Sequence, residues 1–198
     1  MDDVVRQAMA KWPNVPHCFG WLKLDARGHW RMRDERARHL DLPGDKIAHP
    51  ALLGFINRNY THDEEGRWYF QNGPQRVYVD LELTPYVVRT DPVAGFITQT
   101  GATLDEISQA WLTQEGQLVL ASGTIVAALD DRDAAAVLAT LSVAGRAASD
   151  EEIMEWLDGS DAAGLVFSHD GNDLPLQRIG ADKLAGQFGF VTHPRATA

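Results

Sequence analysis

The sequence predicts an α+β protein made of two related, packed units, each with an antiparallel, hairpin-rich sheet and a helix. Several stretches alternate apolar and polar residues on either side of a short turn, which is typical of β-hairpins. A hairpin followed by an amphipathic helix also occurs twice along the 198 residues. We expect an N-terminal unit over residues 1–92 and an acidic C-terminal unit over residues 93–198. Because no low-complexity linker separates them, we expect tight packing, with a single domain as the alternative.

The first hairpin lies in WLKLDARGHWRMR, residues 21–33. Residues two apart on a strand share a face, so the apolar residues of both strands lie together only if Asp25 pairs with His29. This register leaves a three-residue loop that ends in Gly28, where a left-handed backbone is needed. The predicted buried face is Leu22, Leu24, Trp30 and Met32, and the predicted solvated face is Lys23, Asp25, His29, Arg31 and Arg33.

The same test predicts a second hairpin of the same form in AWLTQEGQLVLAS, where Thr113 pairs with Gln117. A helical pattern follows each hairpin. HPALLGFINRNY contains Pro50, which suits a first helical turn. LDDRDAAAVLATL offers Asp130 or Asp131 as the N-cap.

The stretch RWYFQNGPQRVYVDLEL predicts a hairpin rich in aromatic residues. Pro74 has no amide hydrogen for a tight turn on the two residues before it, which favours a four-residue loop over residues 72–75. That register buries Trp68 and Phe70, whereas a three-residue loop, the alternative, exposes both rings among charged residues. The opposite face is predicted to be solvated, and it holds Tyr69, Gln71, Arg76, Tyr78, Asp80 and Glu82.

The same sheet is expected to continue through PYVVRTD, a turn at Asp91-Pro92, and GFITQT. SDEEIMEWLDG begins with a capping-box pattern, Ser149 followed by Glu152, and predicts a short helix. GLVFSHDGNDLPL predicts a hairpin around Asp170-Gly171, in which Pro175 indicates an edge strand.

The charge of the chain is uneven. Residues 1–99 hold 13 basic and 13 acidic side chains, whereas residues 100–198 hold 5 basic and 15 acidic ones. The net charge of the whole chain, −10, therefore comes from the second half. An acidic chain argues against binding to nucleic acid, since affinity for the phosphate backbone comes from lysine and arginine. No stretch is apolar enough to cross a membrane, and no signal peptide precedes the first hairpin, so we expect a cytoplasmic protein.

The basic face of the first hairpin is the best candidate for a binding site. Neighbouring guanidinium groups can bind a phosphate or a carboxylate with parallel hydrogen bonds. We therefore expect a small anion near Arg31, Arg33 and Arg76, with His29 beside them. The alternative is a solvated face whose arginines pair with the acidic C-terminal half, without any ligand.

The solvated face of the aromatic hairpin is a second candidate, with Tyr69 and Tyr78 among its residues. Asp80 and Glu82 lie about 7 Å apart by strand rise, a spacing compatible with paired catalytic carboxylates. They carry the alternative hypothesis of a hydrolase acting in a cleft between the units. Any strand with alternating acids has this spacing, so we assign no catalytic residue.

Other motifs do not indicate an enzyme or a metal protein. The sequence lacks phosphate-cradling glycine loops and Gly-x-Ser-x-Gly, and it has one cysteine, Cys18. LDDRD is explained by helix capping, and HDGND departs from the calcium-loop pattern at Leu174. We therefore expect no metal site and no cofactor.

Long stretches of the chain resemble an uncharacterised proteobacterial family, the domain of unknown function 2946. They are WPNVPHCFGWLKLDARGHWRMRDE, GRWYFQNGPQRVYVDLELTPYVVR and GTIVAALDDRDAAAVL. That family has no established activity to carry over. More distantly, the order of elements is similar to the domain of unknown function family 1285, a likeness that implies repeated α+β motifs and a role in signalling. It is a likeness of architecture and transfers no residue.

These observations predict a non-enzymatic ligand-binding or regulatory module whose partner is a small anion or another protein. A further hypothesis is a structural interaction module whose exposed sheet edges mediate homodimerisation.

Overall fold

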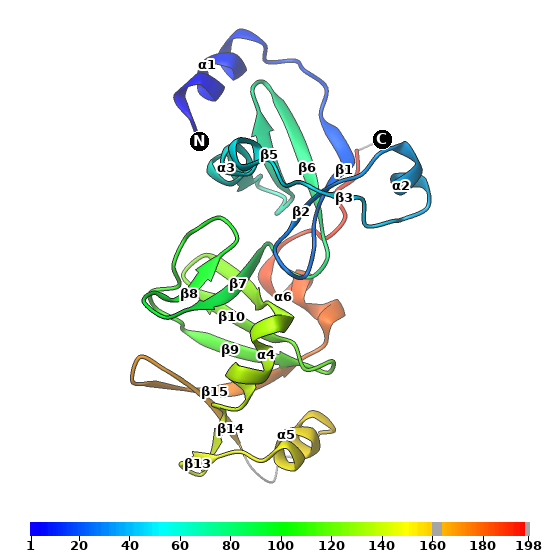
Figure 1. The fold of residues 1–198 in the computed structure, drawn as a ribbon. Coiled ribbons are helices and arrows are strands. Elements are labelled where there is room, and N and C mark those ends of the chain that lie inside the picture. Colours follow the sequence, from blue (N-terminus) through cyan, green and yellow to red (C-terminus); the bar gives the residue numbers. More distant parts are fainter. Residues whose placement is uncertain (160–163, 197–198) are drawn as a thin grey trace.

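The computed structural model describes residues 1–159 and 164–196 and shows an α+β protein of two units (Figure 1). Within these residues the strands form two mixed sheets, a first sheet of six strands and a second sheet of nine. Figure 1 places the first sheet in the upper unit and the second sheet in the lower one, with the C-terminus back beside the upper unit. In this part of the chain no helix is long and apolar enough to cross a membrane.

The first sheet has the order β3-β2-β1-β6-β5-β4, and only its middle pair, β1 and β6, is parallel. Its strands are β1 (Cys18–Leu24), β2 (Trp30–Met32), β3 (Asp45–Lys46), β4 (Tyr60–His62), β5 (Trp68–Asn72) and β6 (Gln75–Leu81). The helices of this unit are α1 (Asp3–Lys11), α2 (Glu35–His39) and α3 (Pro50–Arg58).

The second sheet has the order β13-β12-β14-β15-β9-β10-β11-β7-β8. Its strands are β7 (Tyr86–Asp91), β8 (Gly95–Thr98), β9 (Gln109–Thr113), β10 (Leu118–Ser122), β11 (Ile125–Leu129), β12 (Ser142–Val143), β13 (Arg146–Ala147), β14 (Leu165–His169) and β15 (Asn172–Ile179). The helices that follow or cover it are α4 (Asp131–Leu138), α5 (Asp150–Leu157), a short 3-10 helix (Ala181–Lys183) and α6 (Leu184–Phe188).

The two sheets share one topology. Read from β11, the second sheet runs β11-β10-β9-β15-β14-β12, which repeats the order of the first sheet strand for strand. In both, the first strand of the first hairpin pairs in parallel with the last strand of the unit: β1 with β6, and β9 with β15. The predicted pair of related units is therefore present, and β7, β8 and β13 extend the second copy.

Both three-residue hairpins have the predicted register. The N–H of Asp25 donates to the carbonyl of His29 at 3.1 Å, and that of Thr113 donates to Gln117 at 2.9 Å. Gly28 has a φ of 73°, which the turn requires.

The predicted helix starts are also confirmed. α3 has Pro50 in its first turn, α4 is capped by Asp130, and α5 has the full capping box between Ser149 and Glu152. These features depend on neighbours in the sequence, so the pattern alone predicts them.

Met32 is exposed, contrary to prediction, although Leu22, Leu24 and Trp30 on the same predicted face are buried. Trp30 donates its indole N–H to Asn57 of α3 at 2.8 Å. Met32 lies two residues farther along β2, beside the short edge strand β3, and does not belong to the core that contains Trp30.

In the aromatic hairpin, the predicted residues share the buried face. Phe70 pairs with Val77, and both Trp68 and Phe70 are buried. Strand pairing extends to Asn72 and Gln75, so the turn has two residues instead of the predicted four.

Most of the other face of this hairpin is buried, not solvated as predicted, although Glu82 at its end is exposed. Tyr69, Gln71, Tyr78 and Asp80 are each less than a tenth exposed. The ring of Phe19, from β1, stacks on Tyr78 with centroids 4.5 Å apart, and the C-terminal residues cover Asp80. The alternation of polar and apolar residues identifies two faces but does not reveal that distant segments cover the polar one.

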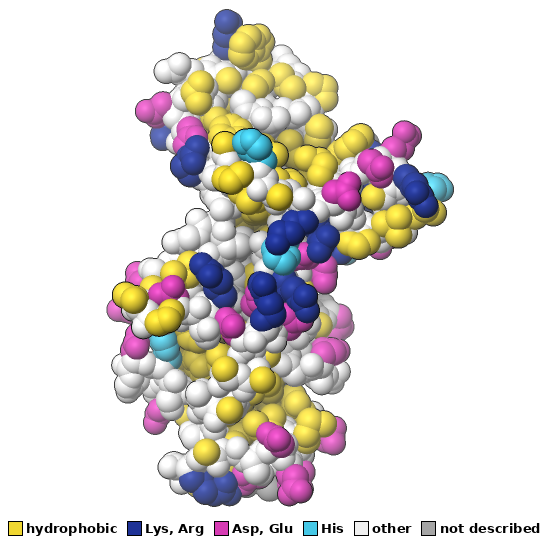
Figure 2. Space-filling view, in the orientation of Figure 1, with side chains coloured by type: hydrophobic (Ala, Val, Ile, Leu, Met, Phe, Trp, Pro, Cys, Tyr) yellow, Lys and Arg dark blue, Asp and Glu magenta, His cyan; other side chains and the backbone are white. Residues whose placement is uncertain are grey.

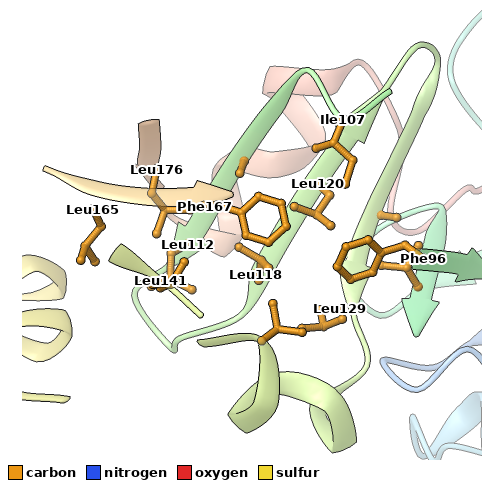
Figure 3. Packing of buried hydrophobic residues seen from close by; sticks show 14 of the residues in the cluster. Phe96, Ile107, Leu112, Leu118, Leu120, Leu129, Leu141, Leu165, Phe167 and Leu176 are labelled. Atoms are coloured by element: carbon orange, nitrogen blue, oxygen red, sulfur yellow. The ribbon is translucent and has the colours of Figure 1, made fainter. Parts of the chain in front are cut away.

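The described residues form two hydrophobic cores. One lies between the second sheet and helices α4 and α5, and Figure 3 shows its packing around Phe96, Leu120 and Phe167. The other combines residues of the first sheet, such as Val79, with residues of the second sheet, such as Trp111. Strands β9–β11 therefore bury both faces, which accounts for their continuous apolar runs.

Two strand assignments were wrong. The predicted hairpin at Asp91-Pro92 forms, but β7 and β8 belong to the second sheet because β7 pairs in parallel with β11. The boundary expected after residue 92 falls in the turn of this hairpin. The hairpin at Asp170-Gly171 also forms, but its strand β15 is internal, not an edge; pairing with β9 begins at Leu176, just after Pro175.

The C-terminal segment, residues 189–195, returns to the first unit. The N–H of Val191 donates to the carbonyl of Gly66 at 3.0 Å, and the N–H of Leu81 donates to the carbonyl of Thr192 at 2.8 Å. Leu184 and Phe190 are buried in the core that joins the two sheets. The first unit is thus completed by residues from the far end of the chain.

Candidate functional site

The predicted basic face of the first hairpin carries its own counter-ion. Arg31 Nε lies 2.6 Å from Asp25 Oδ2, and His29 Nδ1 lies 3.3 Å from the same oxygen. Burial would raise the pKa of Asp25, but the backbone N–H of His29 and the guanidinium of Arg31 outweigh it and hold the pKa below its usual value. Asp25 therefore stays charged, and it offsets the charge of Arg31.

Arg33 is buried and faces the protein instead of solvent. It donates to Asp80, to the carbonyl of Gly20 at 3.0 Å and to Asp41 at 3.2 Å. Asp80 also accepts from Arg195 of the C-terminal segment at 3.0 Å. The predicted solvated positions of Arg33 and Asp80 are wrong because the two side chains form a buried ion pair.

The remaining predicted residues lie in other places. Glu82 pairs with Lys23 at 3.1 Å. Tyr69 and Arg76 line a separate concavity, and Tyr78 beside it donates to Asp63 at 2.9 Å. The structure does not bring the predicted residues together into one site.

A different basic site lies where the first hairpin meets the second sheet. Figure 2 shows lysine and arginine side chains gathered around a histidine at this junction. A cavity of about 240 Å³, here named the waist cavity, is lined by Arg27, Gly28, His29, Val87, Val88, Arg89, Gln99, Asp130 and Arg132.

Gly28 allows the hairpin loop to approach the second unit closely. A Cβ at this position would lie 3.1 Å from Cβ of Gln99, and the backbone is left-handed. Gln99 is itself fixed, because it accepts from the N–H of Val87 at 2.9 Å and donates to the carbonyl of Pro85 at 3.2 Å. Gln99, which lines the waist cavity, is therefore anchored to the backbone of the second unit.

Two arginines of the waist cavity are held by carboxylates at the start of α4. Arg27 donates two 2.8 Å hydrogen bonds to Asp131, and Arg132 Nε donates to Asp130 at 2.9 Å. Burial would raise the pKa of Asp130, but the side chain and N–H of Arg132 outweigh it and lower the pKa. The ion pair of Arg27 with Asp131 also joins the two units.

Arg89 is the open cation of the waist cavity. It is exposed on β7, and no hydrogen bond or ion pair joins its side chain to any other residue that the structure describes. It lines the cavity beside Arg132 and His29, so a ligand there would meet a guanidinium group whose donors are unused.

No group of three or more His, Cys, Asp or Glu side chains among residues 1–159 and 164–196 is placed to hold a metal ion. Three arginines and His29 supply the basic groups that line the waist cavity.

A family model matches residues 1–195, and the family is described as a protein of unknown function (DUF2946). The chain belongs to this family. The resemblance of its long stretches to DUF2946 is thus confirmed over nearly the whole chain.

The expected likeness to the 1285 family also appears among solved structures. A DUF1285 family protein from Silicibacter pomeroyi DSS-3 is similar to this DUF2946 chain with a TM-score of 0.45 and 13% sequence identity, over 89% of this chain and 96% of that one. No curated protein matches the chain.

Arg89 and Arg132 were not among the predicted site residues. Arg89 stands alone in PYVVRTD, and Arg132 lies in LDDRD, which we interpreted as a helix cap. The signal that unites them is the parallel pairing of β7 with β11, which the alternation pattern of a single strand cannot reveal.

Proposed function

We propose that this chain is a non-enzymatic module that binds a small anion, such as a phosphate or carboxylate group, in the waist cavity. The observation that carries the proposal is the open guanidinium of Arg89 in a cavity also lined by Arg27, Arg132 and His29. Asp131 and Asp130 offset Arg27 and Arg132, whereas Arg89 forms no ion pair with any described residue.

The cavity suits regulation because both units contribute to it. Arg27 and His29 come from the first hairpin, whereas Arg89 and Arg132 come from the second unit. An anion bound between them would add a bridge across the junction and would stabilise one arrangement of the units.

The lining favours binding over catalysis. The residues that line the waist cavity include no serine, threonine, cysteine or lysine as a nucleophile. Asp130, its one lining carboxylate, is occupied by Arg132.

The test is a thermal-shift screen followed by titration calorimetry with inorganic phosphate, nucleotides, cyclic dinucleotides, sugar phosphates and dicarboxylates. Loss of one charge-assisted hydrogen bond costs about 1.5–3 kcal/mol, so Arg89→Met should weaken binding of a hit by about tenfold or more. Because Arg89 is exposed and unpaired within the described chain, the variant should keep its stability.

Arg36→Met is the matched control, since Arg36 is an exposed arginine of α2 outside the waist cavity. Binding that is equally strong in Arg89→Met and wild type would rule out the waist cavity. A silent screen would turn attention to a protein partner at the sheet edges.

A further inference from the structure

A second concavity lies at the loop between β4 and β5, and it combines both signs of charge. This β4–β5 cavity has a volume of about 500 Å³, within the range of small-molecule sites. Arg67, Arg76, Asp63, Glu64, Glu65 and Tyr69 line it, together with His62.

One side of the β4–β5 cavity is a closed network. Asp63 accepts from the backbone N–H of Arg67 at 3.0 Å, from Arg67 Nε at 2.9 Å and from the hydroxyl of Tyr78 at 2.9 Å. Arg67 also pairs with Glu65 at 3.1 Å. These charges satisfy one another and shape the wall of the cavity.

The C-terminal segment holds this wall in place. The carbonyl of Gly66 accepts from Val191, and a Cβ on Gly66 would lie 2.0 Å from the carbonyl oxygen of Gly189. The loop that carries Asp63, Glu64 and Arg67 is thus packed against a fixed segment, and its shape is set before any ligand binds.

Two charged side chains of the β4–β5 cavity, Arg76 and Glu64, form no ion pair with a described residue. The guanidinium of Arg76 lies over the ring of Tyr69, 4.7 Å from its centroid, and its position is further set by the Tyr78 hydroxyl. Although three carboxylates line the same cavity, Arg76 forms no ion pair with any described residue, and neither does Glu64. Arg76 and Glu64 have opposite charges, yet they lie too far apart to pair with each other.

We propose that the β4–β5 cavity binds a small zwitterion, a ligand with a carboxylate and an ammonium group, such as an amino acid or a short peptide. The Arg76 guanidinium stacks on Tyr69 and contacts the Tyr78 hydroxyl, and with five N–H donors it can still donate to a carboxylate. Glu64 accepts the ammonium group at the other end. A ligand that joins two separated, unpaired charges accounts for both, which a simple anion or cation does not.

The test is calorimetric titration with alanine, phenylalanine and diglycine, each compared with its N-acetyl and amide derivatives. We expect at least one zwitterion to bind at millimolar concentration or tighter, and both derivatives to bind about tenfold or more weakly because each lacks one charge. Arg76→Met and Glu64→Gln should weaken binding to a similar extent.

Arg38→Met is the matched control, because Arg38 also stacks on an aromatic ring, that of Trp21 at 4.6 Å, outside this cavity. Arg89→Met separates this site from the waist cavity and should leave zwitterion binding unchanged. Absence of binding by all probes, or equal binding of the derivatives or of folded Arg76→Met, would overturn the proposal.

Discussion

The carboxylate of Asp80 is 2% exposed and joins two distant parts of the chain. Arg33, itself buried, donates to one oxygen, and Arg195, whose side chain is 62% exposed, donates to the other. Removing one partner of a buried ion pair leaves an uncompensated charge at a cost of about 3–5 kcal/mol, whereas exposed partners contribute less than about 1 kcal/mol. We therefore expect Arg33→Met to lower the free energy of unfolding by about 3 kcal/mol and Arg195→Met by less than about 1 kcal/mol, as measured by urea denaturation.

Adding Asp80→Asn to Arg33→Met should restore part of the lost stability, because it removes the unpaired charge. Equal losses from the two arginine variants would show that Arg33 is not the main partner.

The alternation of residues along a strand depends only on adjacent residues, so the sequence assigned Arg33 and Asp80 to the correct faces of their strands. It could not show that these faces meet under the C-terminal segment, because no local pattern records a contact across more than a hundred residues.

Helix α5 begins with a capping box that makes its first turn sensitive to acid. Glu152 accepts from the N–H of Ser149 and from Arg146 Nη1, both at 2.9 Å, and these contacts lower its pKa from 4.5 to about 2. A carboxylate whose pKa is lowered by folding contributes stability that is complete above its unfolded pKa and is lost as the pH falls through its folded pKa. The difference in free energy of unfolding between wild type and Glu152→Gln should thus be constant above about pH 5 and should shrink towards pH 2.

In an Arg146→Met background, Glu152→Gln should cost less stability above about pH 5, since the guanidinium is the largest cause of the lowered pKa. A difference in stability between wild type and Glu152→Gln that does not change with pH would contradict the assigned contacts.

This helix, like the hairpins at Gly28 and Gly116, was predictable because caps and turns depend on adjacent residues. The neighbours of β7 and β15 were not, because they depend on parallel pairing between strands that are distant in the sequence.

The end of the chain packs into the core that lies between the two sheets. Phe190 and Leu184, from the end of the chain, are buried in the core that also contains Trp111 and the first sheet. Truncating a buried phenylalanine costs about 3–5 kcal/mol. We expect removal of residues 189–198 to cost at least that much and to destabilise the first unit, even though the deletion lies at the opposite end of the sequence.

Amide hydrogen exchange locates the effect, since the N–H of Leu81 donates to the carbonyl of Thr192. Deletion of residues 189–198 should expose the Leu81 amide and speed its exchange. Phe190→Ala should cause a smaller increase in the exchange rate, because it loosens the same core. Val93→Ala is the control, because Val93 is 96% exposed in a turn of the second unit. If Leu81 stayed protected and the stability were unchanged, the C-terminal segment would only lie on the first unit. If both changed, neither half of the chain would be an independent domain, and a ligand bound between the units would act on the stability of the whole protein.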